Sequence, residues 1–226
     1  MHDERVRERI EFFATILLAF ATVLTAWSAF QSTKWNGSEA VHFANASALR
    51  TESAKADDTA NAQQVVDVET FVSWASAVAD ERRTDPSAST GPDGAYVPEP
   101  DALSGFLFER LRDEFQPAVE AWLAEDPLQD PEAPPTPFDM PEYQLAEQER
   151  AEQLDVDADE EAKVARRDNQ RGDNYVLATV LFASVLFFAG LSGKLGSTRN
   201  RLITITFAVV LLGSGLALLA VFPTKL

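Results

Sequence analysis

The chain has 226 residues, 46% of them apolar, a formal net charge of −17 and no cysteine. Without cysteine the chain forms no disulfide, no thiolate metal site and no cysteine nucleophile. The acidity excludes nucleic acid as the expected partner, because phosphate backbones are bound by Lys and Arg. A salt-adapted surface and an acidic binding surface would both explain the charge, and both interpretations stay open.

Three uncharged apolar stretches predict three transmembrane helices, at residues 12–30, 175–193 and 202–222. A helix needs about 20 apolar residues to cross a hydrocarbon core of about 30 Å. A buried core helix is the alternative, but these stretches have no charged face to present to water. The first is interpreted as an uncleaved anchor, because no small-x-small signal-peptidase site follows it. The predicted fold class is therefore an all-α membrane protein.

Basic residues close to the spans set the predicted orientation. Residues 1–11 and the loop 194–201 are assigned to the cytoplasm, whereas 31–174 and 223–226 are assigned to the outside of the cell membrane. Residues 31–172 carry 12 Lys and Arg against 31 Asp and Glu. The basic residues expected at the inner face are Lys194, Arg199 and Arg201, with Arg5, Arg7 and Arg9 before the first span.

The spans contain no Asp, Glu, Lys, Arg or His, which argues against an ion-coupled transporter. Amphipathic aromatic rings settle at the membrane–water interface, so Trp27, Trp35 and Tyr175 are the predicted anchors on the outer side. Small residues at helical spacing favour close helix packing, either within one chain or between subunits. They are Ala21, Thr25, Ala29, Ala178, Ala189 and Gly193.

The segment between the first and second spans is predicted to be a long helical hairpin. A helical pattern runs from about Ser38 to Arg83, and a charged, proline-free stretch from Glu142 to Asn174 continues into the second span. Loops are expected at 85–100 and at 126–141, which holds six of the twelve prolines. Asp101 or Ser104 is expected to cap an amphipathic piece, and Pro117 to begin a second short helix or to introduce a kink. The apolar face of the region 103–122 is a candidate core or partner surface, and it consists of Leu103, Phe106, Leu107, Leu111, Phe115 and Trp122.

No catalytic, cofactor or metal site is predicted. His42 has no acidic or histidine neighbour at ligand spacing along the chain, and His2 lies at the terminus. The run Asp155-Val-Asp-Ala-Asp begins like a calcium loop but lacks the required Gly and Glu, and the Gly-rich turn at 190–198 lacks the phosphate-loop spacing. Asn36 and Asn45 fit the glycosylation pattern, which matters only in a host that has this pathway.

Two stretches carry a resemblance to a known group of proteins. They are Ala26-Trp-Ser-Ala-Phe-Gln-Ser-Thr-Lys-Trp after the first span and Gly172-Asp-Asn-Tyr-Val-Leu-Ala at the entry to the second. Together they resemble a poorly characterised prokaryotic family of three-span membrane proteins, catalogued as a domain of unknown function. The resemblance implies a topology and no activity, so it assigns no functional residue.

These patterns favour a non-enzymatic membrane scaffold or accessory subunit, which self-associates or binds another membrane protein through its outer helical segment. The motivation is a long outer segment without any chemical site. The alternative is an oligomeric ion channel, in which the acidic outer segment attracts cations. Its pore would be lined by Thr15, Thr22, Thr25 and Ser28.

Overall fold

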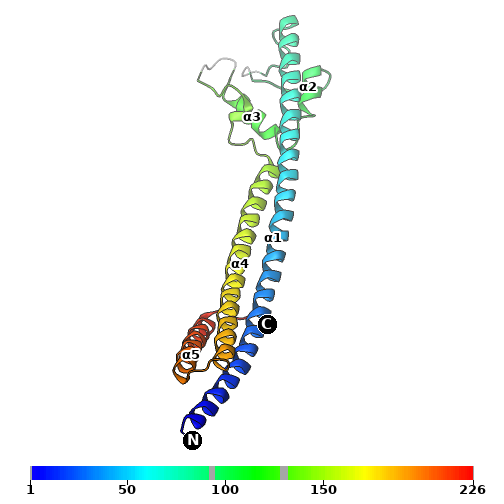
Figure 1. The fold of residues 1–226 in the computed structure, drawn as a ribbon. Coiled ribbons are helices and arrows are strands. Elements are labelled where there is room, and N and C mark those ends of the chain that lie inside the picture. The colour runs from blue at the N-terminus through cyan, green and yellow to red at the C-terminus, as the bar shows by residue number, and fades with distance from the viewer. Residues whose placement is uncertain (1, 92–94, 128–131, 226) are drawn as a thin grey trace. The chain divides into compact units, whose positions relative to one another are not determined.

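The computed structural model describes residues 2–91, 95–127 and 132–225, and the side chains of all these except 2–4, 6 and 7 (Figure 1). Residues 92–94 and 128–131 of the two predicted loops, both chain ends and the side chain of Arg7 lie outside the described residues. Over the described residues the chain is helical and has no strand, which confirms the predicted all-α class.

Helix α1 covers His2–Thr84, 83 residues in all, and includes both the first predicted span and the helix predicted from Ser38. No proline interrupts it, and Gly37 is its only glycine. It ends just before Asp85-Pro86, because a residue that precedes proline disfavours the helical conformation. Arg82 and Arg83 lie in the last turn, where positive charge interacts favourably with the helix dipole.

Helix α4 covers Ala146–Ser192 and joins the charged, proline-free stretch to the second predicted span without a break. Helix α5 covers Thr198–Val221, and Pro223 follows closely after its end. The predicted basic loop 194–201 is shorter in the structure, because Thr198 to Arg201 already form the first turn of α5.

Helices α1, α4 and α5 are long and apolar enough to cross a membrane, as the sequence predicts. In the most apolar 18-residue window of each helix, at most 33% of the residues are buried inside the protein. Many of the other apolar side chains, Phe20, Val180 and Leu202 among them, are exposed. A surface of this kind is suited to lipid rather than water.

The chain divides into two compact units. Unit 1 comprises Met1–Ala48 and Asp157–Leu226, and unit 2 comprises Leu49–Val156.

In unit 1 small residues let the three helices approach closely. Ala21 of α1, Val185 of α4 and Ala208 of α5 are buried together. Gly215 of α5 lies against Phe182 of α4, and a Cβ added there would come within 2.6 Å of the ring. Of the predicted small residues, Ala21, Ala178 and Ala189 are fully buried, whereas Ala29 and Gly193 are exposed.

Helices α1 and α4 run antiparallel in unit 1. Three contacts occur in reverse order along the two helices: Asn36 with Gly172, Glu39 with Asn169, and His42 with Glu161. Small alanines occupy much of this interface, as expected for closely packed helices, and Ala46, Ala158, Ala162 and Ala165 are buried.

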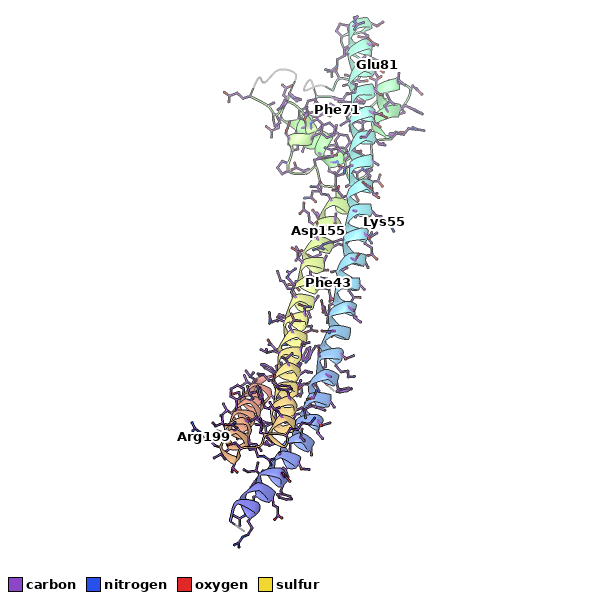
Figure 2. The ribbon with its side chains drawn as sticks, in the orientation of Figure 1. Phe43, Lys55, Phe71, Glu81, Asp155 and Arg199 are labelled. Carbon is purple, nitrogen blue, oxygen red and sulfur yellow. The ribbon has the colours of Figure 1, made fainter. Side chains whose placement is uncertain are left out.

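In unit 2 an aromatic core forms against α1, and Phe71 of α1, labelled in Figure 2, packs against it. Helices α2 (Leu103–Phe108) and α3 (Gln116–Ala124) and the 3₁₀ helix η1 (Pro137–Asp139) surround the core. Pro117 lies in the first turn of α3, as predicted. The leucine repeat does not continue as one helix, because α2 ends at Phe108 and turns carry Leu111 and Phe115 into the core.

The predicted caps of α2 are wrong, since Ala102 occupies the N-cap position without a side-chain hydrogen bond. Ser104 bonds instead to Glu81 of α1, which accepts from its backbone N–H at 2.9 Å and from its hydroxyl at 2.6 Å. Burial raises the pKa of Glu81, but the hydrogen bonds from Ser104 and Ser89 outweigh it and leave the pKa lowered. Next to Ser104, a Cβ on Gly105 would lie 1.9 Å from the Glu99 carbonyl oxygen, so glycine is required there.

Candidate functional site

Two of the predicted interface aromatics, Trp35 and Tyr175, belong to a polar cluster of unit 1. The buried indole of Trp35 has the Arg171 guanidinium 4.6 Å and the Lys225 ammonium 4.8 Å from its ring centroid. Both distances suit a cation–π interaction. Tyr175 is also fully buried, and its hydroxyl donates to the Pro223 carbonyl at 3.2 Å. Trp27 is exposed, with its ring centroid 5.9 Å from that of Phe30.

Asp168 is the buried acid of this cluster. Its carboxylate lies 3.2 Å from Arg171 Nη1 and 3.6 Å from Lys225 Nζ, so two cations compensate one buried charge. Sequence reasoning missed Asp168, although it precedes Tyr175 by seven residues and therefore lies on the same helix face. An acid on the buried face of a helix was the signal that could have found it.

The C-terminal tail is held by the same cluster. The side chain of Gln31, fully buried, donates to the Lys225 carbonyl at 3.1 Å and accepts from the Lys225 backbone N–H at 2.8 Å. The Lys225 ammonium donates to the Ser38 hydroxyl. Residues 223–225 therefore lie beside the start of the segment that follows the first span.

At the other end of the spans, the side chain of Arg201 is bonded to other groups of the protein. Its guanidinium donates to the carbonyls of Leu195 and Gly193, at 2.5 and 3.2 Å, and forms an ion pair with Glu11 at 3.0 Å. It thereby satisfies carbonyls that are left without partners past the end of α4. Lys194 and Arg199 are exposed, and Figure 2 labels Arg199 at the start of α5.

His42 does have an acidic partner, which lies on another helix and is invisible to local spacing. Its Nδ1 is 2.6 Å from Glu161 Oε2, and both side chains are partly exposed. The hydrogen bond from His42 is the main cause of a lowered pKa of Glu161. Asn45, one predicted glycosylation site, also donates to Glu161 at 3.4 Å, while the other, Asn36, lies against Gly172.

Most of the proposed pore residues make the hydrogen bonds of their hydroxyl groups within their own helix. The hydroxyls of Thr15, Thr22 and Thr25 donate to backbone carbonyls four residues earlier. Ser28 is fully buried, and its hydroxyl has no hydrogen-bond partner among the described residues.

In unit 2 the predicted apolar face is divided between core and surface. Leu111, Phe115 and Trp122 are buried in the aromatic core, and Leu107 is partly buried against it. Leu103 and Phe106 are exposed on α2, and the Arg110 guanidinium lies 3.5 Å over the Phe106 ring.

An ion-pair network that the sequence did not reveal crosses this core. The carboxylate of Asp67, only 1% exposed, accepts from Arg112 at 2.7 and 3.2 Å and from the Tyr143 hydroxyl at 3.3 Å. Hydrogen bonding to Asp67 raises the pKa of Arg112. Burial, and then the charge of Asp67, raise the pKa of Tyr143 to about 12. The raised pKa values keep the Arg112 and Tyr143 side chains protonated, so that both donate hydrogen bonds to Asp67.

A small cavity of about 70 Å³ lies at the edge of the aromatic core. Trp74, Arg82 and Tyr96 line it, and each has one buried polar atom without a hydrogen-bond partner among the described residues. The other lining residues are apolar: Ala75, Val78, Trp122 and Leu123.

A valine stripe, defined as Val65, Val68 and Val72, lies exposed on α1 in unit 2. The three side chains are 57%, 40% and 55% exposed and follow the three-and-four spacing of one helix face. The core is packed against a different face of α1, through Asp67, Phe71 and Trp74. The periodic valines therefore indicate a helix correctly, but they are not the residues that bury it.

No group of three or more His, Asp or Glu side chains within the described ranges could hold a metal ion. No family model, no curated protein and no solved structure matches the chain, so the resemblance noted from the sequence gains no support.

Proposed function

We propose that this chain is a non-enzymatic membrane scaffold that self-associates through its helical segment between the first and second spans. The observation that carries the proposal is the valine stripe. Burying half-exposed valines in an interface stabilises it by about 1 kcal/mol for each side chain. Copies that share one membrane and one orientation bring the same residues to the same height. The stripe of one copy can then meet the stripe of another about a twofold axis.

Oxidative crosslinking tests this contact directly, because the chain contains no cysteine. We expect Val68→Cys and Val72→Cys to form disulfide-linked dimers in membranes, since facing residues bring their Cα atoms within about 7 Å. The matched control is Ser73→Cys, which is exposed on the same helix turn but points about 120° away from the stripe. We expect several-fold less dimer from the control.

Equal crosslinking of all three variants would indicate random collision and would contradict the proposal. So would a wild-type chain that sediments as a monomer at every concentration in detergent. A cation conductance in reconstituted membranes would favour the channel instead, and a dimer without conductance would favour the scaffold.

We also propose that the segment 31–174 and the C-terminus face away from the cytoplasm. Lys194, Arg199 and Arg201 favour this orientation, whereas the basic residues within 163–171 lie on the other side of the second span. Single cysteines at the exposed positions Thr59 and Ser197 distinguish the two orientations. With a membrane-impermeant maleimide on intact cells, we expect Thr59→Cys to react at once and Ser197→Cys to react only after lysis. The reverse result would place the acidic segment in the cytoplasm.

A further inference from the structure

A basic groove on α4, defined by Lys163, Arg166 and Arg167, lies in the part of unit 1 next to the second span. It is an open groove of about 690 Å³, and Glu160, Val164 and Gln170 complete its lining. Positions 163, 166, 167 and 170 are three, four and seven residues apart, so the three cations and the Gln170 amide share one face of the helix.

None of the three basic side chains has an ion pair or hydrogen bond with another described residue. By contrast, the neighbouring Arg171 is paired with Asp168, and Arg201 with Glu11. Like charges three and four residues apart repel one another on a helix. The groove thus holds three cations without an ion pair and one carboxylate, that of Glu160, and this local excess of positive charge in a chain of charge −17 favours an anion.

The donors of the groove match a phosphate group. Two guanidinium forks give paired N–H donors, an ammonium adds a point charge and an amide adds a further donor. Arg167 precedes Tyr175, the first residue of the second predicted span, by eight residues, or about 12 Å of helix. The polar headgroup region extends about 5–8 Å beyond the hydrocarbon core, so these side chains reach lipid phosphates only by extending along the helix towards the span.

We propose that Lys163, Arg166 and Arg167 form a binding site for a phosphate-bearing anion, supplied by a lipid headgroup or by a soluble phosphate compound. The overall negative charge of the chain repels anions in general, so binding requires this local groove. Binding at this site does not require self-association, and it is possible on either side of the membrane.

The test uses the full chain in nanodiscs and a variant with Lys163→Gln, Arg166→Gln and Arg167→Gln. Glutamine keeps the helix propensity and removes only the charges. The matched control carries Lys55→Gln, Arg83→Gln and Arg150→Gln, three exposed basic residues outside the groove, and so has the same net charge. Calorimetry in nanodiscs of phosphatidylcholine measures the affinity for inorganic pyrophosphate. Native mass spectrometry measures the retention of phosphatidylglycerol from mixed lipid.

We expect the groove variant to lose pyrophosphate affinity, phosphatidylglycerol retention or both by about tenfold, and the control to change less than about twofold. Loss of pyrophosphate affinity identifies a soluble phosphate, and loss of lipid retention alone identifies a headgroup. Two results overturn the proposal: a wild-type chain that binds neither probe, or an equal loss in the groove and control variants. Either result would leave the crosslinking of the valine stripe unaffected, so this site and the scaffold fail independently.

Discussion

Replacing Arg112 with alanine is expected to lower the free energy of unfolding of unit 2 by about 3–5 kcal/mol. The substitution removes both hydrogen bonds from the guanidinium to Asp67 and leaves only that from Tyr143. A carboxylate that is 1% exposed is then buried without a countercharge. Hydrogen–deuterium exchange of the α1 amides within residues 49–84, measured on the full chain, reports the local stability.

Arg110→Ala is the matched control, since Arg110 is exposed and contacts only the surface residue Phe106. We expect this control to cost less than about 1 kcal/mol. A second variant, Asp67→Leu with Arg112→Met, removes both charges and is expected to recover most of the loss, because a buried ion pair contributes little net stability over apolar residues. Equal losses from Arg110→Ala and Arg112→Ala would show that the buried pair is not essential.

Phe115→Ala is expected to destabilise unit 2 by a similar amount, about 3–5 kcal/mol, through the cavity that it leaves. The Phe115 ring is fully buried and stacks on Phe138 with 5.0 Å between centroids. Tyr143 and Phe71 contact it edge-on, at 5.4 and 6.4 Å. Thermal unfolding followed by tryptophan fluorescence detects the change, because Trp74 and Trp122 lie in the same core.

Phe106→Ala provides the comparison for this substitution. It removes the same number of atoms from an α2 side chain that is exposed, so little apolar contact is lost and no cavity forms. We expect a change below about 1 kcal/mol. If both phenylalanines cost the same, Phe115 would not be the centre of the core.

The helices and the apolar spans were predictable because each depends on a continuous local pattern. An uncharged run of about 20 residues and a long stretch without proline determine structure regardless of distant partners. The structure accordingly ends α1 just before Asp85-Pro86, α4 next to Gly193 and α5 shortly before Pro223.

The contacts between charged side chains were not predictable, because their members are far apart in the chain. Asp67 and Arg112 are 45 residues apart, and His42 and Glu161 are 119 apart. Residue size on α1 does not indicate which positions are buried. The valine stripe is exposed, whereas the packed positions of α1 in the same unit include Ala56, Ala60 and Asp67. Ala56 and Ala60 are packed because small residues permit close approach of helices, and Asp67 is packed because Arg112 neutralises its charge. Neither effect produces a periodic pattern of apolar residues.

The attachment of Lys225 to Gln31 has a consequence for biosynthesis. The two residues are 194 positions apart, so a nascent chain inserts its first span long before the partner of Gln31 has left the ribosome. At about 5–20 residues per second, the delay is about 10–40 s. A chain that stops before Lys225 leaves the buried Gln31 amide without this partner and therefore differs from the finished fold in the interior of the helix bundle.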